Sequence, residues 1–271
     1  MGNRTRGNFR IGIIQAKVSF SIEEGESQIL KFINEAKKNN VDTLGLPEDC
    51  VCGLLENHKN YDPLDFLSKV AKEYKINLFG SNTTFEGDSC YGTGFYIDDE
   101  GKLISKVHKI LLTKPEKEAG FSAGNQIQIF KTEFGKAAIL ICRDAFSRYS
   151  PTWFYNLKKR GVEYILVPSM SIKFDDKSIN FWLSSMWLLA RWLDIYIFAP
   201  STIGKNYTPY ESFGNALIVE RDRGFLKQGS EDKEELLTAD IPLRSEEKIK
   251  EDFKLKWDPV EAPEVEIVEK E

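Results

Sequence analysis

The sequence predicts an α/β protein in which helices cover either one mixed β-sheet or two β-sheets packed together. Strands and helices alternate over residues 10–74, a run of strands without an intervening helix follows over residues 77–142, and helices return after Cys142. Alternation alone would favour a doubly wound parallel sheet. The strand-only middle adds antiparallel neighbours, so it favours a mixed sheet or a second sheet with helices outside.

The first part of the chain contains two strand–helix units. Residues 10–18 are short, apolar and rich in β-branched side chains, which is typical of a buried strand. Residues 22–39 place apolar side chains at helical spacing with charges on the opposite face, and they predict a helix. The second unit is a buried strand over residues 41–46, ended by Pro47, and a helix over residues 63–74.

Strands dominate the middle of the chain, and turn-forming sequences rich in Gly, Asp and Lys lie between some of them. The expected strands cover residues 77–85, 91–98, 103–109, 127–132 and 135–142. Ser150-Pro151 then marks a helix start, with Ser150 as the N-cap and Pro151 as the first helical residue. That helix runs to about Arg160, and the remaining elements are a strand over 164–168, a helix over 178–193 and strands over 195–202, 213–219 and 236–240.

The composition describes one globular domain followed by a charged tail. A chain of 271 residues that is 41% hydrophobic can build one large core or two small ones. Beyond about Arg244 the chain is charged and contains proline, and residues 258–271 are strongly acidic. We therefore expect a single domain over residues 1–245 and a surface arm over residues 246–271.

The charge pattern excludes several classes of partner. The net charge is −5 and both signs are mixed along the chain, so nothing favours nucleic acid or an anionic membrane. No apolar run approaches the ~20 residues that span a bilayer. Residues 9–16 are too short for a secretory signal and are broken by Arg10, so we expect a cytoplasmic protein. Four irregularly spaced cysteines do not predict a disulfide framework.

Cys142 is a candidate nucleophile. It ends the strand expected over residues 135–142, and the chain turns over residues 143–146 before the next helix. Ligands meet α/β sheets at such strand ends, and a sharp turn can present a side chain and the following N–H to one point. The alternative is an inert buried cysteine. Cys50 and Cys52, with His58 nearby, lack the spacing of a zinc site, so we expect neither metal nor cofactor.

Two further charged residues, Lys109 and Glu48, lie at or just past the ends of expected strands. In an extended segment Val107 and Lys109 share one side, so an inward Val107 would bring Lys109 inward as well. The alternative is that the strand has ended and Lys109 lies in solvent. Glu48 comes just past the strand over residues 41–46, where a carboxylate can serve as a general base. Taken alone, Glu48 would be interpreted as an ordinary loop acid.

Three segments together resemble the nitrilase superfamily of carbon–nitrogen hydrolases. Leu46-Pro47-Glu48 resembles the family's Pro-Glu at a strand end, the Val107–Leu111 segment resembles its lysine element, and the Leu140–Asp144 segment resembles its nucleophile segment. Acid, lysine and cysteine occur in the family's order, and the resemblance covers residues 10–242. It implies an α-β-β-α sandwich of four layers with two mixed β-sheets, and homodimers or larger assemblies in which helices of two subunits pack together.

The resemblance also assigns roles to residues. Glu48 would act as general base, Cys142 would form an acyl thioester, and Lys109 would stabilise the developing charge with the backbone N–H of Arg143. A fourth acid that holds substrate or water would be Glu116, with Glu118 as the alternate. The expected substrate is a small-molecule amide or carbamoyl compound. Nitrile hydrolysis, or a catalytically silent member of the fold that acts as an interaction module, remain the alternatives.

Several details near the site leave the substrate class open. Gly92 or Gly94 stands where many members of the family have Asn, and residues 147–149 replace the family's usual Phe-Pro-Glu. Asp144 favours the amidase and carbamoylase side of the family. Arg143 or Arg148 could pair with a substrate carboxylate. The tryptophans expected on the helix over 178–193 could line a pocket, but their helical spacing favours packing in the core or between subunits. These are Trp182, Trp187 and Trp192.

Overall fold

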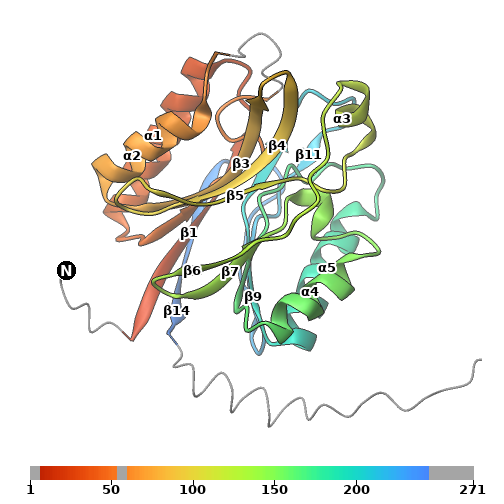
Figure 1. Cartoon of the computed structure of the whole chain (residues 1–271). Coiled ribbons are helices and arrows are strands. Elements are labelled where there is room, and N and C mark those ends of the chain that lie inside the picture. Colours follow the sequence, from red (N-terminus) through yellow and green to blue (C-terminus); the bar gives the residue numbers. More distant parts are fainter. Residues whose placement is uncertain (1–6, 54–59, 244–271) are drawn as a thin grey trace, which may run out of the picture.

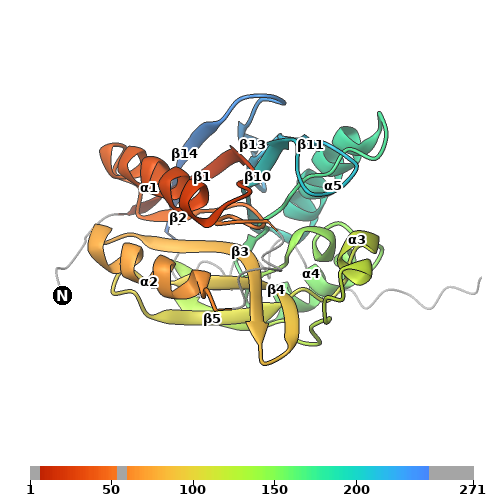
Figure 2. The same ribbon diagram turned by 90° about the horizontal axis from the view of Figure 1, so that it is seen from above.

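Two β-sheets pack face to face, and a pair of helices covers the outer face of each sheet (Figures 1 and 2). This computed structural model describes residues 7–53 and 60–243. The expected four-layer α-β-β-α sandwich with two mixed sheets is confirmed. His58 and the expected arm over residues 246–271 lie outside the described residues.

The first sheet is built mainly from the N-terminal half of the chain. Its strands run in the order β11 (Ser212–Phe213), β10 (Ser201–Gly204), β1 (Asn8–Lys17), β2 (Thr43–Gly45), β3 (Asn77–Glu86), β4 (Ser89–Ile97) and β5 (Leu103–His108). Strand β1 pairs in parallel with β2 and β10, and antiparallel with β14 (Glu235–Pro242). The β3–β4–β5 meander is antiparallel, which accounts for the strand-only middle of the sequence.

The second sheet follows from the C-terminal half. Its order is β13 (Gly224–Gln228), β12 (Leu217–Glu220), β9 (Tyr196–Ala199), β8 (Tyr164–Leu166), β7 (Gly135–Ile139) and β6 (Ile129–Thr132). Strands β7, β8 and β9 are parallel. Strand β6 pairs antiparallel with β7, β12 antiparallel with β9, and β13 antiparallel with β12. The strand expected over residues 213–219 is divided between β11 and β12, and strand β13 was not predicted from the sequence.

Helices complete the outer layers. Helices α1 (Ile22–Lys38) and α2 (Pro63–Tyr74) lie on the first sheet, and α4 (Ser150–Lys159) and α5 (Ser178–Leu193) lie on the second (Figure 1). The short helix α3 (Lys114–Glu118) and the 3₁₀ turn η1 (Cys142–Asp144) fall in loops. Apolar side chains therefore form three layers, one between the sheets and one under each helix pair. Burial of these apolar surfaces is the main force that holds the four layers together.

Pro200 divides an element that the sequence predicts as one strand over residues 195–202. The chain leaves the second sheet after β9 and enters the first sheet as β10. Proline has no N–H to donate to a ladder, so pairing stops there and the chain can cross between the sheets.

The helix start at Ser150 differs from the expectation by one residue. Tyr149 occupies the N-cap position, and Ser150 is already helical. The Ser150 hydroxyl accepts from the Ser147 N–H at 2.7 Å and donates to the Asp144 carbonyl at 3.0 Å. The Ser150 side chain thus binds the 3₁₀ turn η1 and does not cap α4.

The tryptophans of α5 divide between the core and the surface. Trp182 is buried beside Phe146 and Phe213, whereas Trp187 and Trp192 are exposed. A hydrophobic segment long enough to cross a bilayer occurs in none of the helices within residues 7–53 and 60–243.

The two glycines of β4 give a matched test of the packing between the sheets. A Cβ at Gly94 would lie 2.8 Å from Ile139 Cγ2, whereas a Cβ at Gly92 would have ordinary contacts at 3.5 Å or more. The Gly94→Ala variant should therefore lower the free energy of unfolding by about 1–3 kcal/mol. Gly92→Ala should change it by less, and equal urea midpoints for the two variants would contradict this account of the packing.

Candidate active site

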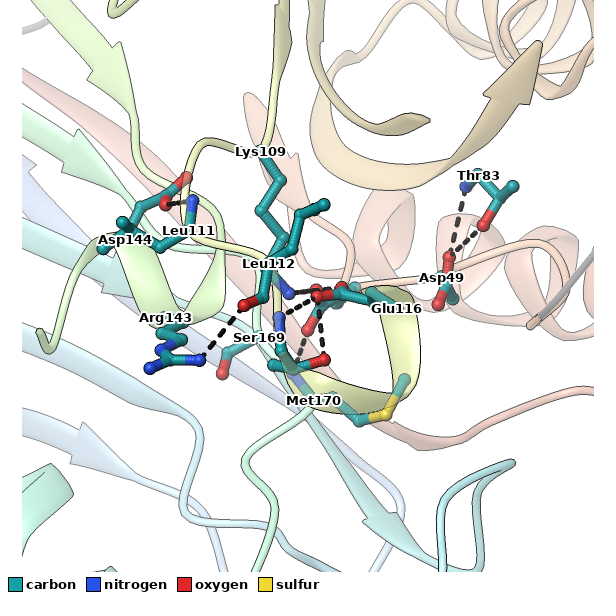
Figure 3. Close-up of polar contacts among 12 residues, drawn as sticks. Asp49, Thr83, Lys109, Leu111, Leu112, Glu116, Arg143, Asp144, Ser169 and Met170 are labelled. Carbon is teal, nitrogen blue, oxygen red and sulfur yellow. Dashed lines mark hydrogen bonds and ion pairs between the residues drawn. The ribbon is translucent and has the colours of Figure 1, made fainter. Parts of the chain in front are cut away.

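Four segments meet where strands of both sheets end. Glu48 follows β2 and Lys109 follows β5 in the first sheet, and Cys142 follows β7 and Met170 follows β8 in the second. Figure 3 shows Lys109, Glu116 and Met170 lying close together, with Asp144 on one side and Asp49 on the other. The sandwich therefore brings these residues, far apart in sequence, to one place.

Lys109 lies at the centre of this cluster. Its side chain is 1% exposed, and its Nζ lies 2.6 Å from Glu48 Oε1 and 2.6 Å from Glu116 Oε1. Strand β5 ends one residue earlier, at His108, but the Lys109 N–H still donates to the Gly92 carbonyl at 2.8 Å. The chain thus stays extended, Lys109 follows the buried Val107 inward, and the alternative of a solvent-exposed lysine is wrong.

Glu48 and Glu116 each accept hydrogen bonds at Oε2, the carboxylate oxygen that is not bound to Lys109. The Met170 N–H donates to Glu48 Oε2 at 3.0 Å. Glu116 Oε2 accepts from the N–H of Thr113 at 2.6 Å and from its hydroxyl at 2.8 Å, within the capping box of α3. Each carboxylate therefore meets Lys109 from a fixed direction.

Of the two candidate accessory acids, the structure brings only Glu116 to Lys109. Glu118 has a side chain that is 67% exposed, and it lies 3.7 Å from Lys114 on the surface of α3. Residues two apart on a helix point in different directions, so α3 does not direct both acids to Lys109.

The carboxylates keep Lys109 charged. Burial alone disfavours its ammonium form, but the charges of Glu48, Cys142 and Glu116 outweigh this and raise the pKa of Lys109 well above its ordinary value. Lys109 is therefore held as an ammonium, and it can stabilise a neighbouring negative charge.

The backbone at Cys142 places the thiol between the sheets. Ala137, Ile139 and Ile141 pack between the sheets, whereas Ala138 and Leu140 pack under the helices. Continued alternation would send Cys142 to the helix side. Instead Cys142 has φ +46°, in the left-handed region that non-glycine residues rarely adopt, and it joins the layer between the sheets.

The resting thiol of Cys142 is neutral. Burial and the charge of Glu48 raise its pKa to about 12, while Lys109, the Met170 N–H and the Ser169 hydroxyl act in the opposite direction. The thiol therefore lies buried beside charged neighbours. It needs a base to take its proton before it can act as a thiolate.

Asp144 fixes the turn that follows the thiol. Its carboxylate accepts from the N–H groups of Ile110 at 3.1 Å and Leu111 at 2.7 Å, so it joins η1 to the segment after Lys109. Burial raises the pKa of Asp144 to about 6, and these two N–H groups limit the rise. The Arg143 side chain is exposed and donates to the Leu112 carbonyl at 3.1 Å. Pairing of Arg143 or Arg148 with a substrate carboxylate stays a hypothesis.

Asp49 is a buried acid beside the site that the sequence reasoning did not select. Its Oδ1 accepts from the N–H and hydroxyl of Thr83, both at 3.1 Å, and its Oδ2 bonds the Tyr207 hydroxyl. Burial and the charges of Glu48 and Glu116 raise the pKa of Asp49 to about 7. The signal available in the sequence was a second acid directly after Glu48 at the end of a buried strand.

The residues that the structure describes contain no group of three or more His, Cys, Asp or Glu side chains that could hold a metal ion. Cys50 and Cys52 are both buried. The carboxylates of the site are satisfied by Lys109 and by N–H and hydroxyl donors, so the chemistry of this cluster is that of an acid, an ammonium and a thiol.

The raised pKa of Asp49 predicts a pH dependence of stability. Since this pKa rises from 3.8 to about 7 on folding, the folded chain holds the proton more tightly than the unfolded chain. The contribution of Asp49 to the free energy of unfolding should therefore fall as the pH rises through this window, by on the order of 2 kcal/mol between about pH 5 and about pH 8.

Urea unfolding at these two pH values checks this expectation. Asp49→Asn cannot titrate, so its midpoint should change less with pH than that of the parent chain. Asp65→Asn, on the exposed face of α2, is the matched control and should retain the parent's pH dependence. An unchanged pH difference in Asp49→Asn would contradict the assignment.

Comparisons with solved structures agree with this architecture. Nit3 of Saccharomyces cerevisiae, a member of branch 10 of the nitrilase superfamily, superimposes with a TM-score of 0.78 at 20% identity, and the match covers 94% of this chain and 96% of Nit3. A double mutant of the amidase from Nesterenkonia sp. AN1, in complex with acrylamide, gives a TM-score of 0.76 at 17% identity over 93% of this chain and 100% of the amidase. At this identity the two structures establish a shared fold.

Sequence comparisons identify the family. The probable hydrolase YhcX of Bacillus subtilis is 27% identical over 50% of this chain and 30% of its own length. The bifunctional nitrilase/nitrile hydratase NIT4B of Lupinus angustifolius is 24% identical over 70% of this chain and 57% of its length, so the chain spans less than two thirds of either relative. The carbon-nitrogen hydrolase family model matches residues 10–251, and the chain therefore belongs to the carbon-nitrogen hydrolase family.

Proposed function

We propose that this chain hydrolyses the carbon–nitrogen bond of a small amide or carbamoyl compound through a thioester on Cys142. One observation carries the proposal: a buried ammonium, Lys109, is held between Glu48 and Glu116 next to a thiol at a strand end. A base, a cation and a nucleophile within one cluster are the groups that acyl transfer to a thiol requires.

In the first half of the reaction, Cys142 Sγ attacks the carbonyl carbon while Glu48 accepts the thiol proton. The carbonyl π electrons move to oxygen, and Lys109 and the backbone N–H of Arg143 stabilise the resulting oxyanion. When the tetrahedral intermediate collapses, the carbon–nitrogen bond breaks, Glu48 returns its proton to the leaving nitrogen, and ammonia or an amine departs. An acyl thioester on Cys142 remains.

In the second half, water enters and Glu48 accepts one of its protons as the water oxygen attacks the thioester carbon. The carbon–sulfur bond then breaks, the thiolate regains the proton from Glu48, and the carboxylic or carbamic acid leaves. The Met170 N–H, bonded to Glu48 Oε2 at 3.0 Å, leaves Glu48 Oε1 as the oxygen that faces Lys109 and that we assign to proton transfer.

Glu116 is assigned a positioning role within this scheme. Its Oε1 binds Lys109 and its Oε2 accepts two bonds from Thr113, so both oxygens are engaged within the protein. It therefore holds the ammonium in place. The expectation that the fourth acid holds substrate or water is replaced by this assignment in our proposal.

The charge of the site favours a neutral substrate. Two carboxylates and one ammonium leave a net negative charge in a buried place, and a substrate anion next to the thiol would be repelled. Amides and carbamoyl groups are neutral. Nitriles are neutral as well, and the likeness to a nitrilase/nitrile hydratase makes nitrile hydrolysis the second candidate. We further propose a homodimer or a larger homo-oligomer, with no membrane or nucleic-acid partner.

Substitution of the three central residues tests the mechanism. A panel of amides, carbamoyl compounds and nitriles, assayed by ammonia release, first identifies a substrate. Cys142→Ala should then abolish turnover, and Glu48→Gln and Lys109→Met should each lower kcat/KM by about 10² or more, because base or charge stabilisation is lost. Lys114→Met, on the surface of α3, is the control for Lys109→Met. Near-parental rates in Glu48→Gln or Lys109→Met would remove that residue from the mechanism.

Alkylation of Cys142 tests the base independently of any substrate. Because the pKa of the thiol is raised to about 12, reaction with neutral iodoacetamide should require Glu48 to take the proton. Glu48→Gln also removes a charge that raises the thiol pKa, but burial, the larger cause, keeps this pKa raised, so loss of the proton acceptor should slow the labelling by about tenfold or more. The charged reagent iodoacetate should react more slowly than iodoacetamide in the parent chain.

The partly exposed Cys90 provides the internal control in the same experiment. Peptide mapping by mass spectrometry should show that Cys90 reacts at a rate that the Glu48 substitution leaves unchanged. If Cys142 is labelled equally fast in parent and variant, and no compound of the panel releases ammonia, the chain is a catalytically silent member of the fold.

A further inference from the structure

A hydrogen bond between Asp49 and Tyr207 joins two segments that lie more than 150 residues apart in sequence. Asp49 directly follows the proposed base, Glu48. Tyr207 belongs to the irregular segment of residues 205–211, which connects β10 to β11. Neither residue belongs to the acid, lysine and cysteine set, so the mechanism leaves their contact unexplained.

Each carboxylate oxygen of Asp49 forms hydrogen bonds with a different segment of the chain. Oδ1 accepts from the N–H and the hydroxyl of Thr83 in β3, both at 3.1 Å. Oδ2 bonds the Tyr207 hydroxyl. The carboxyl group therefore binds β3 with one oxygen and the 205–211 segment with the other, and removal of the phenol hydroxyl would leave Oδ2 without this bond in a buried place.

The backbone couples Asp49 to Glu48. Asp49 has φ +52°, so the chain turns sharply directly after Glu48, and the Cys50 N–H then donates to the Ser81 carbonyl at 3.1 Å. A non-glycine residue keeps this left-handed conformation only where its surroundings hold it. The side-chain bonds of Asp49 supply such a hold on the turn that carries Glu48.

A second path of hydrogen bonds returns from the 205–211 segment to the other side of Glu48. Asn206 donates to the Ser212 hydroxyl at 3.0 Å, which lies 2.7 Å from the Thr202 hydroxyl. Thr202 in turn donates to the Met170 carbonyl at 2.6 Å. The Met170 N–H binds Glu48 Oε2. The segment thus reaches Glu48 both through the chain at Asp49 and through Met170.

We propose that Asp49 and Tyr207 are positioning residues whose hydrogen bond keeps the 205–211 segment on the turn after β2 and keeps Glu48 aimed at Lys109 and Cys142. The inference rests on the proposed function, because it assigns Glu48 the role of base. A displacement of about 1 Å of a reacting group can lower a rate by about 10².

Kinetics of four variants of the full chain test this role. Asp49→Ala and Tyr207→Phe remove the bond and should lower kcat by about tenfold, with KM within about twofold of the parent, since base alignment matters most in the transition state. Asp49→Asn can still accept from Thr83 with its oxygen and donate to the Tyr207 oxygen with its NH₂, so it should recover most of the activity that Asp49→Ala loses. Tyr210→Phe, an exposed tyrosine in the same segment, is the matched control and should behave as the parent.

Gly53→Ala provides a test that deletes no polar atom. A Cβ at Gly53 would lie 2.6 Å from Tyr207 Cδ1, so the added methyl should push the ring away from Asp49. Its kcat should fall as in Tyr207→Phe. If Asp49→Ala, Tyr207→Phe and Gly53→Ala all keep the parent's kcat, or if Asp49→Asn is as impaired as Asp49→Ala, the positioning role is wrong.

Hydrogen exchange of the amides in residues 205–211, followed by mass spectrometry, separates this inference from the proposed function. Exchange should be at least about threefold faster in Tyr207→Phe and Asp49→Ala than in the parent, and unchanged in Asp49→Asn and Tyr210→Phe. Unchanged exchange in all variants overturns the contact as a hold on the segment. Faster exchange in a chain that hydrolyses no compound of the panel refutes the hydrolase function and with it the effect on Glu48, while the Asp49–Tyr207 contact stands.

Discussion

The ammonium of Lys109, buried between Glu48 and Glu116, constrains the rest of the site. A charge in this place is stable only if it is paired and if the remaining lone pairs of its partners are satisfied. The protein meets both conditions with contacts of 2.6 Å to each carboxylate and with N–H and hydroxyl donors on their other oxygens. Loss of one carboxylate would remove one of the two ion pairs that hold the Lys109 ammonium. The two acids, the lysine and their donors therefore form one unit.

This unit also sets the state of the thiol. Many cysteine nucleophiles are activated by a lowered pKa. Here burial and Glu48 raise the pKa of Cys142 to about 12, so the thiol stays neutral at rest and is less exposed to unwanted alkylation or oxidation. In the proposed reaction the thiolate forms only as Glu48 takes the proton, at the moment when a carbonyl group is present to receive the electrons.

The sandwich makes this convergence possible because each sheet contributes part of the site. Glu48 and Lys109 follow strands of the first sheet, and Cys142 and Met170 follow strands of the second. The hydrogen bond from Met170 to Glu48 and those from Ile110 and Leu111 to Asp144 connect the two halves directly. The packing of the two sheets therefore also determines the geometry of the reacting groups.

The sequence by itself determined the fold class, most strands and helices, and the three central residue types, because these depend on local periodicity and on short motifs at strand ends. The helices over residues 63–74 and 178–193 were predicted to the residue. Local patterns did not predict that Pro200 would divide one strand between two sheets, or that Ser150 would exchange its cap for a contact with Asp144.

Only the tertiary structure decided where the candidate side chains point and which of them meet. Strand alternation would direct Cys142 toward the helices, and the left-handed φ of +46° reverses this direction. Glu116 rather than Glu118 belongs to the site because Glu116 forms the ion pair with Lys109. The Asp49 side chain is held by its hydrogen bond with Tyr207. Contacts between residues distant along the chain leave no periodic signal in it, since they arise when the sheets pack and the loops close over their ends.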